Sequence, residues 1–185
     1  MNWKIELSKL IEKSGYSHIE IYARTNIPVA TISNMSNKRH KYLTCEQFIL
    51  FKLLFEETYQ ALLDNLFGKE AFSKVKTVEK DGELTKMGSY FTDKYKYEVF
   101  PKKKLVDCTD IKSSRIDYLF TNSFENIRID EITKLELASG EKIGSFSKLF
   151  FSHVQLNSEK EYERLLKEQR QKNNQANERR KKTEK

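Results

Sequence analysis

Cysteine, proline, tryptophan and histidine are scarce in this chain of 185 residues, which contains 2 Cys, 2 Pro, 1 Trp and 3 His. Cys45 and Cys108 have none of the paired spacings that build zinc sites or disulfide frameworks. The histidines, His18, His40 and His153, are too scattered in the sequence to predict a metal site. We therefore expect a reduced, cytoplasmic protein with no metal and no cofactor.

Long apolar runs are also absent. Phe48-Ile49-Leu50-Phe51 ends at a lysine, far short of the roughly 20 apolar residues that a membrane span needs. Residues 3–6 already carry charges, so no secretory apolar stretch begins the chain. These absences predict neither a membrane segment nor export.

Signals of catalysis are weak. The sequence has no glycine-rich phosphate loop, and a metal-dependent nuclease would need a cluster of carboxylates. Asp107, Asp110, Asp117 and Asp130 have no spacing that distinguishes such a cluster from solvated ends of strands. We expect the chain not to be an enzyme.

The charge balance is basic, with 34 Lys and Arg against 27 Asp and Glu and a net charge of +7. Most of the surplus lies in residues 158–185, which form a tail that is rich in Lys, Arg and Glu and has neither glycine nor proline. A basic surplus favours a polyanionic partner, and the tail is expected to be helical or disordered.

The first 68 residues predict five short helices. Ser17 with Glu20, and Thr44 with Gln47, have the spacing of capping boxes that start helices. Pro28 suits the first turn of another helix, because its fixed φ is helical and its missing N–H is not needed there. The five helices are expected to begin near Trp3, Ser17, Pro28, Thr44 and Thr58, and the last to end at Gly68.

Residues 69–157 alternate apolar and polar side chains, which is typical of half-buried strands. The alternation involves Tyr95, Tyr97 and Val99, then Ile116, Tyr118 and Phe120, then Ile127 and Ile129, then Leu135 and Leu137. The expected fold class is therefore α+β, in which a five-helix domain (1–68) precedes a small antiparallel β-rich domain (69–157) for dimerisation or partner binding.

The segment 21–37, IYARTNIPVATISNMSN, resembles the helix-turn-helix of the lambda-repressor and Cro-like family without a gap. Ile27 matches a turn valine, Thr31-Ile32-Ser33 match a central Ser-Thr-Ile-Ser run, and Asn37 matches a closing asparagine. The resemblance covers residues 1–68. It implies a DNA-binding domain in which the second helix of the motif enters the major groove.

Three positions depart from the family. Tyr22 stands where the family has a small alanine at the helix crossing, so either the helices sit further apart or the tyrosine points outward. Asn26 replaces a glycine in the turn, and it tolerates the left-handed backbone best after glycine. Lys38 replaces the final glycine.

The resemblance also implies the contacting residues. Asn34 is able to bond adenine through both atoms of its amide, while small apolar groups lie against thymine methyls, which predicts an A·T-leaning site. The expected base-reading residues are Val29, Ala30, Thr31 and Asn34. The expected phosphate contacts are His18, Ser33, Asn37, Lys38, Arg39, His40 and Lys41.

We therefore predict a sequence-specific DNA-binding transcriptional repressor of phage, plasmid or mobile-element type, with double-stranded DNA as partner and a homodimer as its expected state. Two alternatives stay open. In one, residues 69–157 inhibit a host defence enzyme, as in an anti-CRISPR protein, and the helix-turn-helix is autoregulatory. In the other, residues 69–157 form a small RNA-binding barrel whose tyrosines stack bases.

Overall fold

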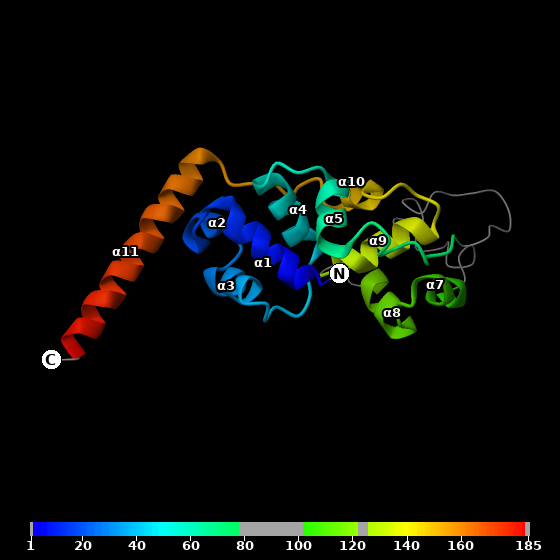
Figure 1. The fold of residues 1–185 in the computed structure, drawn as a ribbon, viewed down its shortest axis with the longest axis horizontal. Helices are drawn as coiled ribbons and strands as arrows, with labels where there is room; N and C mark the ends of the chain where they lie inside the picture. Colours follow the sequence, from blue (N-terminus) through cyan, green and yellow to red (C-terminus); the bar gives the residue numbers. More distant parts are fainter. Residues whose placement is uncertain (1, 78–101, 122–125, 184–185) are drawn as a thin grey trace.

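The computed structural model describes residues 2–77, 102–121 and 126–183 (Figure 1). Across these ranges the regular secondary structure is helical, and the extended segments pair only in an isolated antiparallel bridge between Thr44 and Arg128. The α+β prediction with a β-rich domain is therefore wrong. None of the helices in the same ranges is both long enough and apolar enough to cross a membrane.

The first five helices begin and end close to their predicted bounds. They are α1 (Trp3–Ser14), α2 (His18–Thr25), α3 (Val29–Ser36), α4 (Cys45–Leu54) and α5 (Tyr59–Phe67). Both predicted capping boxes are present, at Ser17 with Glu20 and at Thr44 with Gln47. Each box satisfies backbone N–H groups that the first turn of a helix leaves without partners.

Helices also occupy the described part of residues 69–157. They are α7 (Lys102–Thr109), α8 (Ser113–Thr121), α9 (Ile129–Ala138) and α10 (Ser145–Phe150). Ile116, Tyr118 and Phe120 lie in α8, and Leu135 and Leu137 lie in α9, so the strands predicted there are wrong. The alternating tyrosines of residues 95–97, and Val99, lie outside the described residues.

The physical reason for this correction is the spacing of the buried side chains. Ile129, Ile132, Leu135 and Ala138 are all buried in α9, three residues apart. That interval keeps them on one face of a helix, whereas a strand would turn every second one outward. Ile127 does precede an extended residue, Arg128, but the pairing is a single bridge to Thr44.

One continuous apolar core joins the two halves of the chain, with α9 and α10 lying against α4 and α5 (Figure 1). The backbone N–H of Cys45 donates to Ile127 O at 2.9 Å, and that of Ile129 donates to Leu43 O at 3.0 Å. These two bonds place the start of α9 directly beside the start of α4.

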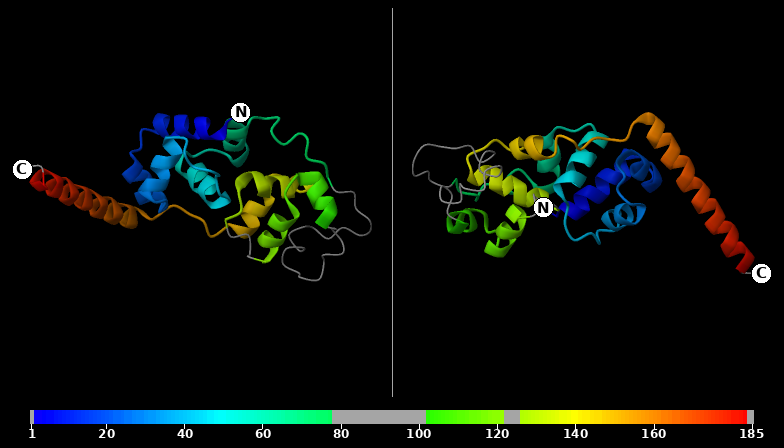
Figure 2. Two further views of the ribbon diagram at one scale, coloured as in Figure 1. Left: turned by 90° about the horizontal axis from the view of Figure 1, so that it is seen from below. Right: turned by 180° about the vertical axis from the view of Figure 1, so that it is seen from behind.

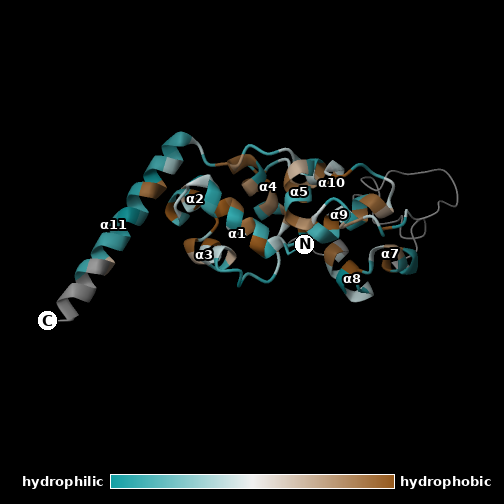
Figure 3. Ribbon diagram, in the orientation of Figure 1, coloured by the Kyte–Doolittle hydropathy of each residue, from teal (hydrophilic) through white to brown (hydrophobic). Residues whose placement is uncertain are grey.

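The predicted basic tail forms α11 (Glu159–Thr183), which packs against α2 and then extends away from the rest of the molecule (Figures 1 and 2). Figure 3 shows that α11 is hydrophilic over nearly all of its coloured length. Leu165 and Leu166 are aliphatic, and Leu165 is buried at 6% exposure. A short apolar contact therefore anchors a helix that is otherwise polar.

Candidate nucleic-acid interface

The turn between α2 and α3 is fixed by local hydrogen bonds. Asn26 adopts the left-handed backbone (φ 58°), as expected from its place in the sequence, and its N–H donates to Tyr22 O at 2.8 Å. The buried Thr25 hydroxyl donates to Ile21 O at 2.6 Å and accepts from the Ile27 N–H at 3.2 Å. The two helices are thus joined by a short turn with satisfied polar groups.

Helix α3 has one buried face and one exposed face. Ile32 and Met35 are buried at 0% and 1% exposure, and α3 packs against both α1 and α2. Ala30 and Asn34 are exposed and lie one turn apart, four residues along the helix. Of the other expected base-reading residues, Val29 and Thr31 are partly exposed.

The end of α3 holds a basic loop, which we define as residues 37–42. Asn34 O accepts the N–H of Arg39 at 2.7 Å and that of His40 at 3.1 Å. Lys38 takes the left-handed backbone (φ 61°) at the position where the family has glycine. Lys38, Arg39 and Lys41 are exposed, so the loop that follows α3 carries three exposed cations.

Two further phosphate candidates are held at this loop. The Asn37 side-chain amide donates to Ser33 O at 2.9 Å and approaches Ser33 Oγ at 3.4 Å. The pair therefore closes the last turn of α3.

Of the two histidines of the predicted site, His18 has a partner within the protein and His40 is partly buried. His18 Nε2 lies 3.0 Å from Ser36 Oγ, so His18 bridges α2 to the end of α3. Burial lowers the pKa of His40, which makes its imidazole neutral at neutral pH. Lysine and arginine therefore supply the positive charge of the basic loop.

Tyr22, the bulkiest departure from the family, is partly exposed at the edge of the core, whereas its neighbour Ala23 is fully buried. The Tyr22 side chain is one of the partly buried hydrophobic groups that pack against the apolar core.

The contact between α2 and α11 is a feature that the sequence interpretation missed. Arg24 Nη1 donates to Glu159 Oε2 at 2.6 Å, and the Arg24 guanidinium lies 3.8 Å from the centroid of the Tyr162 ring. The sequence pattern that could have predicted this contact is the apolar group of Tyr162, Leu165 and Leu166. Its spacing of three and four residues is that of one helical stripe.

No group of three or more His, Cys, Asp or Glu side chains is placed to hold a metal ion in the described ranges. Of the acidic residues considered from the sequence, Asp130 pairs with Arg128 at 3.3 Å. Asp110 lies before α8 and Asp117 lies within it.

Comparison of this chain with family models, with curated proteins and with solved structures gives no match. Function is therefore inferred from the geometry of the described residues.

Proposed function

We propose that this chain binds double-stranded DNA in a sequence-specific manner and regulates transcription, with α2 and α3 forming a helix-turn-helix of the lambda-repressor and Cro-like type. One observation carries the proposal. Helix α3 buries Ile32 and Met35, exposes Ala30 and Asn34, and ends in a loop of exposed cations. This is the distribution that a recognition helix needs, because one face must be fixed while the other reads bases.

The exposed face of α3 has the chemistry to read A·T pairs. The Asn34 side chain is free of hydrogen bonds to the described residues, so both its amide oxygen and its NH₂ are available. An asparagine amide matches N6 and N7 of adenine in the major groove. Ala30 and the Thr31 methyl group offer apolar contact for the methyl group of thymine.

The basic loop supplies contacts that do not depend on sequence. Lys38, Arg39 and Lys41 are exposed and directly follow α3. Cations at that position neutralise backbone phosphates, release counterions and fix the register of the helix in the groove. Base reading and phosphate anchoring are thereby assigned to adjacent but separate side chains.

The small-barrel alternative needs strands in residues 69–157, and the regular elements among the described residues of that range are helices. It is not proposed. The homodimer stays a prediction, to be measured by light scattering of the full chain with and without DNA.

Selection from a pool of random-sequence DNA duplexes tests this function. The full chain should enrich an A·T-containing motif. Asn34→Ala should enrich a motif that is relaxed at one base pair. The control is Asn173→Ala, which removes an exposed asparagine from α11 and should leave the motif unchanged. If the wild-type chain enriches no motif, the proposed function is wrong.

A further inference from the structure

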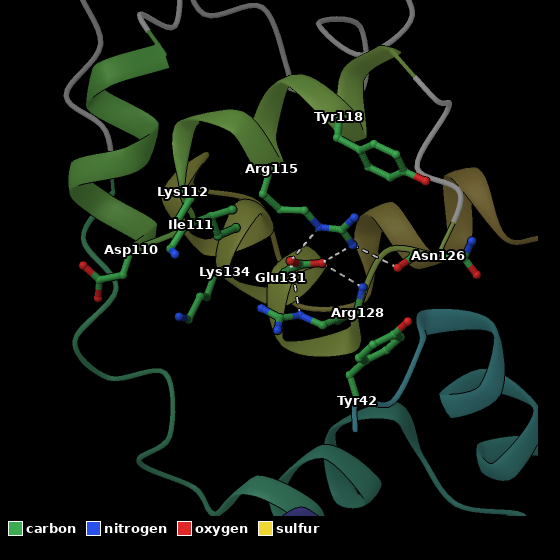
Figure 4. Close-up of a pocket in the computed structure, with 10 residues that line it drawn as sticks. All are labelled: Tyr42, Asp110, Ile111, Lys112, Arg115, Tyr118, Asn126, Arg128, Glu131 and Lys134. Carbon is green, nitrogen blue, oxygen red and sulfur yellow. Dashed lines mark hydrogen bonds and ion pairs between the residues drawn. The ribbon is translucent and has the colours of Figure 1, made fainter. Parts of the chain in front are cut away.

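A cavity of about 600 Å³ lies between α8, α9 and the end of the basic loop (Figure 4). Its lining comes from three separate stretches of the chain, so proximity in the sequence does not predict it. The charged residues that line it are Asp110, Lys112, Arg115, Arg128, Glu131 and Lys134.

A buried carboxylate organises two arginines in this cavity. Glu131 is 2% exposed, and its oxygens accept from Arg115 Nε at 3.0 Å and Arg115 Nη2 at 2.9 Å. Arg128 Nε lies 3.2 Å from Glu131 Oε1, and the Arg128 backbone N–H donates to Oε2 at 3.0 Å. Figure 4 shows the two guanidinium groups converging on Glu131 from opposite sides.

Each guanidinium retains donors after these contacts. Arg115 Nη2 also donates to Asn126 O at 3.0 Å, which leaves the N–H groups of its Nη1 without a partner among the described residues. Arg128 uses Nη2 to pair with Asp130 at 3.3 Å. Because the planar guanidinium groups are already held in position, the cost of ordering them around an anion is reduced.

The charge of the lining favours an anion. Lys112 and Lys134 join the two arginines, so four cationic side chains face two acidic ones, Asp110 and Glu131. Asp130, which pairs with Arg128 nearby, reduces the positive surplus without removing it. A carboxylate or phosphate that entered the cavity would therefore find uncompensated positive charge.

Two aromatic rings in the lining indicate which class of anion the cavity binds. Tyr42 and Tyr118 are 45% and 40% exposed and both line the cavity. The Arg115 guanidinium carbon lies 5.0 Å from the Tyr118 ring centroid, so charge and aromatic surface are adjacent. Aromatic side chains next to cations are the surfaces on which nucleic-acid bases stack.

We propose that this cavity binds a nucleotide, with its phosphate at Arg115 and Arg128 and its base stacked on Tyr118, the ring that lies beside Arg115. The nucleotide comes from one of two sources, a free nucleotide or a single-stranded segment of nucleic acid. The proposal goes beyond the reading of DNA by α3 and does not depend on it.

Calorimetric titration of the full chain tests this proposal, with adenosine monophosphate, inorganic phosphate and a single-stranded oligothymidylate as probes. The main variant is Lys112→Gln/Lys134→Gln, which leaves both arginines and Glu131 in place. The matched control, Lys69→Gln/Lys148→Gln, removes the same charge from exposed lysines that do not line the cavity. Tyr118→Leu tests stacking. Circular dichroism verifies that each variant is folded.

The main variant should weaken binding of adenosine monophosphate or of the oligonucleotide by about tenfold relative to the control, because it removes two of the four cationic side chains that line the cavity. Tyr118→Leu should weaken the same probe and leave inorganic phosphate unaffected. If the variants weaken binding of the monophosphate, the ligand is a free nucleotide. If they weaken binding of the oligonucleotide alone, the ligand is a single-stranded nucleic acid.

Three results would overturn the proposal. In the first, the main and control variants bind every probe with equal affinity. In the second, inorganic phosphate binds as tightly as both nucleotide probes. In the third, Tyr118→Leu loses no affinity for the nucleotide. Asn34→Ala should bind all three probes like the wild type. That variant separates failure of this site from failure of the proposed DNA-reading function.

Discussion

The side-chain amide of Asn26 donates a hydrogen bond of 2.9 Å to the side-chain oxygen of Asn157. The residue that turns the chain between α2 and α3 is thus also a contact for the segment before α11. Asn157 further donates from Nδ2 to Ala23 O and from its backbone N–H to Arg24 O, both at 2.8 Å. It therefore satisfies carbonyls that the end of α2 would otherwise leave without partners.

Asn157→Ala should lower the free energy of unfolding by about 1–2 kcal/mol, because two side-chain hydrogen bonds are lost and a helix-end carbonyl is left unpaired. Urea unfolding measures this change. Hydrogen exchange should also accelerate in the first turns of α11. The matched control is Asn173→Ala, whose amide accepts only an exposed bond from Gln169. Equal effects of the two variants would show that Asn157 does not anchor α11.

The buried carboxyl group of Glu136 should make the free energy of unfolding depend on pH. Burial raises its pKa to about 7, although the N–H groups of Gly144, Phe146 and Ser147 oppose this by donating to the carboxylate. Since the folded pKa lies above the ordinary value, the folded protein holds this proton more tightly than the unfolded chain. The stabilisation is complete below the unfolded pKa and is lost as the pH rises through about 7.

Urea unfolding between acidic and neutral pH measures this effect. The contribution of Glu136 should fall by about 3 kcal/mol across that range, as the difference between its folded and unfolded pKa values implies. Glu136→Gln has no proton to lose, so its stability should depend less on pH than that of the wild type. Glu163→Gln removes an exposed carboxylate and should keep the wild-type slope. An unchanged slope in Glu136→Gln would contradict the assignment.

Lys38→Gly should stabilise the protein by about 0.5–1 kcal/mol, because the left-handed backbone at this position (φ 61°) is strained for a residue with a Cβ. The control is Lys38→Ala, which removes the same charge and keeps the Cβ. In thermal unfolding, the Lys38→Gly variant should be more stable than the Lys38→Ala variant. The opposite order would mean that the turn is not strained at Lys38.

The helices of residues 1–68 could be predicted because their start and stop signals are local. Ser17 and Glu20 are three residues apart, and Asn26 marks the turn by its own backbone preference. In residues 69–157 the alternations were only two or three apolar residues long. The three-residue spacing of Ile129, Ile132 and Leu135, which the structure shows to be helical, was the more informative pattern.

The features of the candidate sites also differ in how far the sequence could predict them. Exposure of Ala30 and Asn34 follows from the period of a single helix, so the sequence was sufficient to place them on the outer face of α3. The contact of Asn26 with Asn157 spans 131 residues, and the cavity joins Tyr42 to residues 110–134. No local pattern encodes which distant residues meet, so these two features required the structure.

The assignment of α3 as the recognition helix is tested most directly by DNA binding of Asn34→Ala and Arg39→Ala, measured over a range of salt concentrations. Both positions are exposed, with Asn34 in the last turn of α3 and Arg39 in the basic loop that follows it. Asn34→Ala should cost about 1–3 kcal/mol on the selected motif and leave binding to random DNA unchanged.

Arg39→Ala should instead weaken binding to the motif and to random DNA alike, and it should reduce the salt slope by about one unit. Circular dichroism and thermal unfolding must first show that both variants are folded. If the folded Asn34→Ala and Arg39→Ala variants bind the selected motif as tightly as the wild type, α3 is not the recognition element and the central claim is wrong.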